Sequence, residues 1–395
     1  MRLIFISREQ YPHGGAASNR HMAFAKGLLE LGHQVVFVLL EKQSSDIVDF
    51  VYQNIHFKSA VTQEFNNKKI PLSSKLFSYF RLIRNARQII MTLSEREKFD
   101  AIVILSRWNK DIIPFLWISR SLKLKAVHER TEYPFIHCKK TVIGRLSLAI
   151  NLNLLIPRFD GLFVINHVLE EYFRKYAGAN QPIEIINMIV DPSRFKQSAQ
   201  KRILNYSYIT YCGTLNDKKD GVDILLKAYI QVLSRGEIPG SLKLVLIGEY
   251  EENSFRESLM QLIENSGYSD NIVFTGKVNR DDMPGYLCHA EALLLARPNS
   301  KQAEGGFPTK LGEYLATGKP VILTNTGEVG YFLKDGINAF IAEPGSIESF
   351  ASKIGLVFSN YEMALEVGRK GELLVQKEFN YFHEALKLEK FIEEL

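Results

Sequence analysis

Strand-like runs of apolar residues recur along the chain and alternate with longer stretches whose apolar residues have helical spacing. In the first half the strand-like runs are Leu3–Ser7, Gln34–Leu40, Ala101–Leu105, Lys125–His128 and Gly161–Ile165. Parallel strands need a crossover connection, usually a helix, so this alternation is typical of βαβ units. The pattern predicts a doubly wound parallel sheet, whose ligands bind outside the carboxyl ends of the strands.

The same alternation begins again after a polar stretch at residues 198–205. Its strand-like runs are Ser207–Cys212, Leu242–Ile247, Ile272–Phe274, Ala292–Ala296 and Pro320–Thr324. A chain of 395 residues is long enough for two cores of this kind. We therefore predict an α/β protein of two Rossmann-like doubly wound domains, residues 1–200 and 201–379, that face each other across a cleft.

A final helical stretch at about residues 380–395 follows the second alternation. Its apolar residues Phe382, Leu386, Leu388 and Phe391 need a surface to cover. The first domain is the candidate surface for this helix.

Composition narrows the class of protein. The three cysteines, Cys138, Cys212 and Cys288, are far apart and have no CxxC spacing, which favours reduced core thiols in a cytoplasmic protein and not a zinc site. The chain begins with a strand-like run and lacks the pattern of a secretory signal. The most apolar later stretch, Val142–Ile156, is interrupted by polar residues, and we interpret it as a buried helix.

Positive charge is concentrated in the first half. Residues 1–199 carry 28 Lys+Arg against 17 Asp+Glu, a net charge of +11, whereas the whole chain has +5. Such an excess favours an anionic partner, and the alternative is a solvated basic face. The stretch Lys68–Arg87 has six basic residues, no acidic ones and several interleaved aromatic residues. A helix that starts near Pro71 is thus a candidate for peripheral attachment to an anionic membrane, unless it packs on the domain with a solvated edge.

The segment Arg297–Pro320 carries the densest chemical signal. It follows a strand-like run, contains Gly305-Gly306, and is expected to open a helix near Pro308. The amides of Thr309, Lys310 and Leu311 would then form an anion site. Arg297 and Lys310 add charge suited to a diphosphate, and Glu313 lies where a carboxylate can accept hydrogen bonds from ribose hydroxyls. The alternative is an ordinary strand, loop and helix.

This segment resembles the signature of the retaining glycosyltransferases of family 4, which have the two-domain GT-B fold. The matching positions are Phe307, Glu313, Ala316, Gly318, Pro320 and Val321. The first acid of the signature falls on Gly305, so that Glu304, one residue earlier, is the candidate to reach the donor sugar. The resemblance extends over nearly the whole chain and adds Phe307 and Pro308 to the expected donor site.

The resemblance also implies roles for three other loops. Residues 213–226 resemble the segment that carries an Arg and a Lys for the donor diphosphate; Thr214 stands at the Arg position, so Arg297 is expected to replace it. Lys218 and Lys219 are both candidates for the Lys, and we favour Lys219. Val278 follows a strand that resembles the one facing the nucleotide base. Gly14 and Gly15 resemble the glycine-rich loop after the first strand, Gly15 on the donor side and Gly14 on the acceptor side.

A polar cluster follows another strand-like run. His128 resembles the family's histidine near the transferred sugar, and Glu129, Arg130 and Glu132 are candidates for the acceptor side. Such a cluster is costly to bury without a purpose, although a single His is more often a structural residue.

Together these features predict a glycosyltransferase that moves a sugar from a nucleotide diphosphate sugar to an acceptor hydroxyl with retention of configuration. Its catalytic candidates are His128, Glu304, Lys219 and Arg297. We expect no cofactor, no metal, because no Asp-x-Asp motif ends a strand, and no nucleic acid partner. By analogy the acceptor is a glycan or a lipid-linked glycan of surface polysaccharide assembly. A non-hydrolysing sugar-nucleotide epimerase and an inactive glycosyltransferase-like binding subunit remain alternatives.

Overall fold

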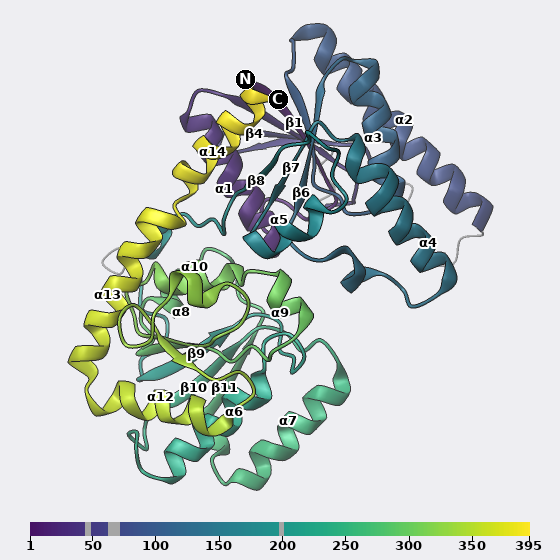
Figure 1. The fold of residues 1–395 in the computed structure, drawn as a ribbon. Helices are drawn as coiled ribbons and strands as arrows, with labels where there is room; N and C mark the ends of the chain where they lie inside the picture. The colour runs from purple at the N-terminus through teal and green to yellow at the C-terminus, as the bar shows by residue number, and fades with distance from the viewer. Residues whose placement is uncertain (44–48, 62–71, 197–200) are drawn as a thin grey trace. The chain divides into compact units, whose positions relative to one another are not determined.

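The computed structural model describes residues 1–43, 49–61, 72–196 and 201–395, and Lys68, Lys69 and Pro71 of the predicted membrane helix lie outside them. The chain divides into two compact units (Figure 1). The first comprises Met1–Asn187 and Tyr381–Leu395, and the second comprises Met188–Asn380. Each contains one mainly parallel sheet, which confirms the predicted pair of Rossmann-like domains.

The first unit is built on an eight-stranded sheet in the order β3-β4-β2-β1-β5-β6-β7-β8. Its strands are β1 (Arg2–Ser7), β2 (Gln34–Leu39), β3 (Asp49–Tyr52), β4 (Ile55–Ser59), β5 (Ala101–Ile104), β6 (Lys125–Arg130), β7 (Gly161–Val164) and β8 (Ile183–Ile185). All neighbouring pairs are parallel except β3 with β4. The central strands are buried on both faces, as expected for a parallel sheet covered by helices.

Helices connect these strands in the first unit. They are α1 (Ala16–Glu30), α2 (Leu72–Arg96), α3 (Asn109–Ser121), α4 (Val142–Ile150), α5 (His167–Arg174) and, from the end of the chain, α14 (Tyr381–Glu394). Short irregular helical segments, η1 (Pro134–His137) and η2 (Asn151–Leu155), lie on either side of α4. Among the described residues, no helix is long and apolar enough to cross a membrane.

The second unit has a six-stranded parallel sheet in the order β11-β10-β9-β12-β13-β14. Its strands are β9 (Tyr208–Cys212), β10 (Lys243–Ile247), β11 (Ile272–Gly276), β12 (Ala292–Leu295), β13 (Val321–Thr324) and β14 (Phe340–Ala342). Its helices are α6 (Val222–Ser234), α7 (Asn253–Ser266), α8 (Met283–Leu287), α9 (Lys301–Gly305), α10 (Thr309–Leu315), α11 (Val329–Phe332), α12 (Ile347–Ser359) and α13 (Tyr361–Glu378). The strand order reverses between β9 and β12, which marks the topological switch point.

The division between the units falls before the polar stretch at which the sequence places it. Met188 belongs to the second unit because its Sδ accepts a hydrogen bond from the Gly312 amide at 3.1 Å. Phe195 is buried in the same unit, where its carbonyl accepts from Cys288 Sγ at 3.1 Å. Residues 188–195 therefore pack against the second core before the polar stretch begins.

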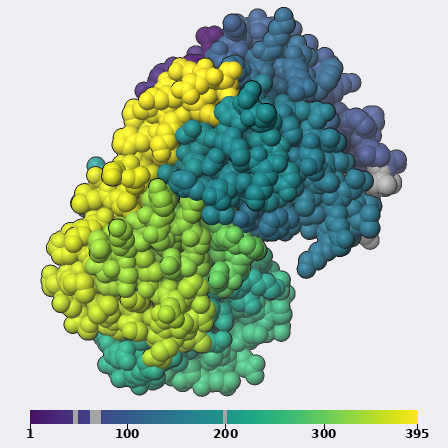
Figure 2. Space-filling view, in the orientation of Figure 1, coloured from purple at the N-terminus to yellow at the C-terminus, as the bar shows by residue number. Residues whose placement is uncertain are grey.

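The C-terminal helix α14 packs against α1, near the opposite end of the sequence. Figure 1 shows α14 in yellow beside α1 in purple, and Figure 2 shows yellow C-terminal residues at the surface next to purple ones. The Tyr381 hydroxyl bonds to Glu30 at 2.9 Å, and His33 bonds to Glu389 at 2.5 Å. Gly27 allows the close approach, because a Cβ there would lie 2.5 Å from the Cβ of Ala385.

We predict that Gly27→Ala destabilises the first unit, although alanine favours helices, because its methyl group would overlap Ala385. The expected loss is about 1–3 kcal/mol in the free energy of unfolding, measured by urea titration. Gly240→Ala is the control, since no atom lies within 4 Å of a Cβ at that position. Equal stability of the two variants would contradict the tight α1–α14 contact.

Candidate functional site

The carboxyl edge of the second sheet brings two predicted segments together. β9 leads into the loop 213–221, and the neighbouring strand β12 leads into the loop 296–308. Because the strand order reverses between these two strands, this edge is where a doubly wound sheet is expected to bind its ligand. The predicted residues Arg297, Lys219 and Lys310 all lie in this region.

Asp220 holds the cations of this edge in place. Its Oδ2 accepts hydrogen bonds from Lys310 Nζ at 2.6 Å and from the Tyr211 hydroxyl at 2.8 Å, and Arg297 Nε lies 3.7 Å from its Oδ1. Burial alone would raise the pKa of the Asp220 carboxyl, but Lys310 and Arg297 hold this pKa below its ordinary value. We call Asp220, Arg297, Lys310 and Tyr211 the Asp220 cluster.

Sequence reasoning missed Asp220, and the cluster changes the picture of Lys310. Lys310, predicted to face a diphosphate, is committed to an ion pair, and its side chain is 17% exposed. The sequence signal that could have pointed to Asp220 is its position directly after Lys218-Lys219, in a loop that follows a strand. Gly213, which directly follows β9, has φ +143° and leaves room for the Lys310 side chain, whose Cε would lie 3.1 Å from a Cβ at that position.

The two lysine candidates have different environments. Lys218 is paired with Glu252 at 3.5 Å, and its side chain is 76% exposed. Lys219 is half-buried, and its carbonyl accepts a hydrogen bond from Arg297 Nε at 3.4 Å. The structure therefore places the backbone of Lys219, rather than that of Lys218, against Arg297.

Glu313 lies on α10 and has a partner that the sequence did not predict. Arg194 Nη1 lies 3.5 Å from Glu313 Oε1, and the Glu313 side chain is 17% exposed. Burial raises the pKa of Glu313, while Arg194 and Arg280 act in the opposite direction.

Helix α10 begins at Thr309, and Pro308 is its N-cap residue rather than its first helical residue. The Leu311 amide donates a hydrogen bond to the Pro308 carbonyl at 2.9 Å. Of the three amides predicted to bind an anion, that of Leu311 is thus used within the helix, and those of Thr309 and Lys310 remain the candidates.

The other donor-side candidates are spread along the same unit. Glu304 lies in α9, and its carboxylate accepts from Lys301 Nζ at 2.6 Å. Phe307 is 6% exposed and packs against Phe332 and Phe379, so its ring belongs to an aromatic cluster. Val278 is half-buried after the end of β11. No group of three or more His, Cys, Asp or Glu side chains in the described ranges is arranged to hold a metal ion.

In the first unit, Gly14 and Gly15 precede α1, and Gly15 is its N-cap residue. A Cβ added at Gly14 would lie 2.8 Å from the Cβ of Ser18 and would overlap it. The loop therefore requires glycine at this position. No atom lies within 4 Å of a Cβ at Gly15. At Gly14 the loop therefore packs tightly against α1, whereas at Gly15 there is space for a side chain.

Glu129 is part of a buried network, which corrects its predicted place at an acceptor. Its carboxylate accepts from Arg20 Nε at 2.7 Å and is bonded to His21 Nε2 at 2.8 Å. Tyr11 extends the network by a 2.6 Å bond to His21 Nδ1. Glu129 is thus held by α1, which leaves it unavailable as the base that the epimerase alternative requires.

His128 is also corrected, because β6 continues to Arg130 and His128 lies within the strand. The ring is fully buried, stacks on Phe159 with centroids 4.5 Å apart, and bonds through Nδ1 to the Ile104 carbonyl at 2.6 Å. Burial, and secondly Arg130, lowers the pKa of His128 well below its ordinary value, so the ring is neutral. A side chain without exposed surface cannot contact a sugar in this arrangement.

Arg130 and Glu132 lie at the end of β6. Arg130 Nη2 donates to Asn151 Oδ1 at 2.6 Å, and Glu132 is bonded to His137 Nε2 at 2.5 Å. Both predicted residues therefore lie at the carboxyl edge of the first sheet, where acceptor-side groups are expected.

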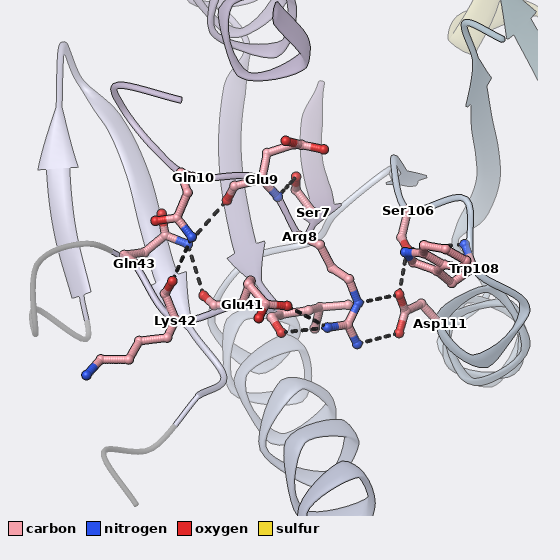
Figure 3. Close-up of polar contacts among 11 residues, drawn as sticks. Ser7, Arg8, Glu9, Gln10, Glu41, Lys42, Gln43, Ser106, Trp108 and Asp111 are labelled. Carbon is pink, nitrogen blue, oxygen red and sulfur yellow. Dashed lines mark hydrogen bonds and ion pairs between the residues drawn. The ribbon is translucent and has the colours of Figure 1, made fainter. Parts of the chain in front are cut away.

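Sequence reasoning also missed an ion pair at the switch point of the first sheet, between β1 and β5. Arg8, just after β1, donates through Nε and Nη2 to the buried Asp111 at 2.6 and 2.8 Å (Figure 3). Its Nη1 reaches Glu41 at 2.9 Å, and Ser106 also donates to Asp111 at 2.5 Å. These bonds join the loops after β1, β2 and β5. Because the pair is separated by about a hundred residues in sequence, no local motif signals it.

We predict that Glu129 contributes to stability in a pH-dependent way. Burial raises its pKa, but His21 and Arg20 lower it to about 2, below the ordinary 4.5. The stabilisation is complete above pH 4.5 and is lost as the pH falls towards 2, and it amounts to about 3 kcal/mol. Glu129→Gln should lower the unfolding free energy at pH 7 by about 3–5 kcal/mol, since it leaves Arg20 buried without a carboxylate.

Urea unfolding of both proteins between pH 7 and pH 4 measures this effect. The difference between wild type and Glu129→Gln should shrink as the pH falls below about 5. Glu97→Gln, in an exposed pair with Arg2, is the control and should change little. A difference that stays constant with pH would show that the Glu129 carboxylate is not the stabilising group.

Comparison with known proteins finds related glycosyltransferases. The family model described as Glycosyl transferases group 1 matches residues 206–360, which include the Asp220 cluster. A GDP-mannose-dependent alpha-(1-6)-phosphatidylinositol monomannoside mannosyltransferase of Mycobacterium tuberculosis is 25% identical over 264 residues, 63% of this chain. The match covers 66% of that relative, slightly less than two thirds of its length.

Solved structures share the fold over the full chain. Sucrose-phosphate synthase from Thermosynechococcus elongatus has a TM-score of 0.76 at 15% identity and covers 100% of this chain and 98% of its own. Anabaena HepE in complex with UDP and glucose has a TM-score of 0.72 at 15% identity, with 100% of both chains covered. Residues 206–360 therefore match the group 1 glycosyltransferases, and the whole chain has the two-domain GT-B fold.

Proposed function

We propose that this protein transfers a sugar from a nucleotide diphosphate sugar to an acceptor hydroxyl, with retention of configuration at the anomeric carbon. The observation that carries the proposal is the Asp220 cluster at the switch point of the second sheet. Two cations, Arg297 and Lys310, are held there by one buried carboxylate, at the edge where doubly wound sheets bind ligands. Fixed cations at such an edge suit a diphosphate.

Charge stabilisation is the main chemical task in this reaction. As the bond between the sugar and the β-phosphate breaks, negative charge accumulates on the phosphate oxygens, and fixed cations stabilise it without reorganising. Arg297 presents a planar guanidinium that can donate two hydrogen bonds to a phosphate. Asp220 then acts as a positioning residue, because it fixes Lys310 and Arg297 before the donor binds.

The remaining donor contacts follow from the same unit. Glu313 is the proposed ribose anchor, and Arg194 would keep its carboxylate oriented towards a hydroxyl donor. Thr309 and Lys310 are proposed to contact the diphosphate, and Val278 the base. We propose front-face attack by the acceptor for retention; Glu304 is the candidate acid beside the sugar, and its ion pair with Lys301 would have to open first.

The donor and acceptor classes are drawn from the relatives. One relative is named for a GDP-mannose donor and a phosphatidylinositol mannoside acceptor, and a structural neighbour holds UDP and glucose. These names support a nucleoside diphosphate sugar as donor and a glycan or glycolipid as acceptor. A thermal-shift panel of UDP, GDP, ADP and dTDP sugars separates the bases.

Attachment to an anionic membrane surface is part of the proposal. On α2, Phe77 is 71% and Phe80 is 67% exposed, and Lys75 and Arg84 are exposed on the same helix. Apolar side chains next to cations, in a half of the chain with net charge +11, suit a negatively charged lipid interface. A lipid-linked acceptor would then lie close to the enzyme.

We predict that Arg297→Gln and Lys219→Gln each reduce turnover about 10²-fold, because each removes a positive charge that would stabilise the departing β-phosphate. Lys218→Gln is the matched control, since Lys218 is exposed and paired with Glu252, and it should retain turnover. Donor hydrolysis or transfer by the purified chain is the measurement. Full turnover in both variants would place the diphosphate elsewhere, and no turnover of any donor by the wild type would favour a binding subunit.

Glu313→Ala is expected to weaken donor binding by more than tenfold in calorimetry while the fold is retained, because the ribose loses its acceptor. Arg194→Gln should have a smaller effect in the same direction, since it leaves the carboxylate in place. Donor affinity equal to that of wild type in a folded Glu313→Ala protein would rule out the ribose role.

Sedimentation with phosphatidylglycerol vesicles tests the membrane proposal. Binding is expected at low salt and should weaken at high salt or after Arg81→Glu with Arg84→Glu, because the attraction is electrostatic. Arg369→Glu with Lys377→Glu in the second unit is the charge-matched control, both side chains being largely exposed. Absence of binding at low salt contradicts attachment.

A further inference from the structure

The first unit contains a pocket of about 300 Å³ at the end of β6, formed with η1, α4 and η2. It lies at the carboxyl edge of the sheet, where the loops after β5 and β6 meet. None of the proposed donor contacts uses it, since its lining residues fall between Arg107 and Asn151. The pocket therefore requires its own explanation.

The lining is cationic. Arg107, Arg130 and Lys139 line the pocket, and no Asp or Glu is among the lining residues. Arg130 is 4% exposed, and among the residues that the structure describes it forms no ion pair with a carboxylate. Its Nε is buried without a hydrogen-bond acceptor. Burial lowers the pKa of Arg130 to about 10, which still leaves the guanidinium charged near neutral pH.

A buried guanidinium without a counter-charge is costly, and a bound anion would remove much of that cost. The guanidinium is held in position by a chain of amides. Arg130 donates to Asn151, Asn151 Nδ2 donates to Asn109 Oδ1 at 2.6 Å, and Asn109 Nδ2 donates to the Ser147 carbonyl at 2.7 Å. This chain joins β6, η2, α3 and α4, so the pocket walls are preorganised.

The rim of the pocket is apolar and open to solvent. Val142 is 83%, Ile143 80% and Leu146 61% exposed. The expectation of a buried helix over Val142–Ile156 is therefore wrong for α4, whereas Leu152, Leu155 and Ile156 are buried. Ile143 also lines the pocket, so the exposed face of α4 begins at the mouth of the cationic site. Figure 1 shows α4 at the periphery of the first unit. An exposed apolar surface of this kind normally marks a binding site.

We propose that this pocket binds the phosphate of an amphiphilic acceptor, with the phosphate on Arg130, Arg107 and Lys139 and the hydrocarbon chain on the apolar face of α4. Three cations match a group with close to two negative charges and several acceptor oxygens, and the adjoining apolar face matches a lipid tail. The assignment rests on the proposed function in one respect only, that the bound phosphate belongs to the acceptor.

The test uses calorimetry on the full chain with short-chain probes below their micelle concentration. Dihexanoyl phosphatidic acid should bind, dihexanoyl phosphatidylcholine should bind at least tenfold more weakly, and inorganic phosphate should bind more weakly than the phosphatidic acid. Equal affinity for inorganic phosphate and phosphatidic acid would show an anion site without a lipid component, and would overturn the amphiphile assignment.

Variants locate the binding. Arg107→Gln with Lys139→Gln should weaken phosphatidic acid binding at least tenfold, whereas Lys140→Gln, exposed but outside the pocket, should not. Ile143→Asn should weaken the lipid probe without changing inorganic phosphate, with the exposed Leu373→Asn as control. Unchanged affinity in the Arg107 and Lys139 double variant overturns the proposal.

Nucleotide binding separates this proposal from the proposed function. The titrations are repeated with saturating UDP or GDP, and the phosphatidic acid should still bind, because its pocket is separate from the Asp220 cluster. Competition with the nucleotide would place the lipid phosphate in the donor site and overturn the pocket. Failure of all nucleotides to bind, with phosphatidic acid binding intact, would contradict only the proposed function.

Discussion

The buried pair of Arg20 and Glu129 is the interaction on which the first unit depends. Arg20 bonds to Glu129 at 2.7 Å and to the Ile186 carbonyl at 2.8 Å, and it also donates to the Asn187 carbonyl. One guanidinium thus joins α1, β6 and the segment at which the chain leaves the unit. The Asn187 amide donates to Glu384 of α14 at 2.7 Å, which connects the same point to the C-terminal helix. Removing either charge leaves its partner buried and unpaired.

The second unit has a comparable arrangement with a different purpose. In the Asp220 cluster a buried carboxylate also holds two cations, but the cluster lies at the open edge of a parallel sheet. The same electrostatics that position Lys310 and Arg297 there also make the edge suited to a phosphate. A buried pair in the core supports the fold, whereas a pair at the switch point also prepares a site.

The first sheet combines both situations within one strand. On β6, His128 is in the core, Glu129 is paired with α1, and Arg130 borders a pocket. Successive side chains of a strand point to opposite faces, and the last one reaches the carboxyl edge. A cluster of adjacent polar residues in sequence therefore divides into three different environments. Sequence reasoning assigned these residues to one site because it ended the strand at His128.

Several features were predictable from the sequence alone. The alternation of strand-like and helical runs determines two parallel sheets, because parallel strands require helical crossovers, and the signature around Glu313 indicates a resemblance to a glycosyltransferase family. These are local patterns, and each residue contributes to them through its immediate neighbours in the chain. The candidates Arg297 and Lys219 were found because they lie in loops that follow strands.

Tertiary structure alone decided which charges meet. Asp220 pairs with Lys310 and Arg8 with Asp111 across long sequence separations, and neither pair leaves a local motif. The same holds for burial: Phe307 is covered by Phe332 and Phe379, whereas Val142 and Ile143 remain exposed, although all these residues are similarly apolar. The sequence determined the elements and the family resemblance because periodicity and motifs are local. Pairing and burial were decided by packing, because they depend on which distant elements come into contact.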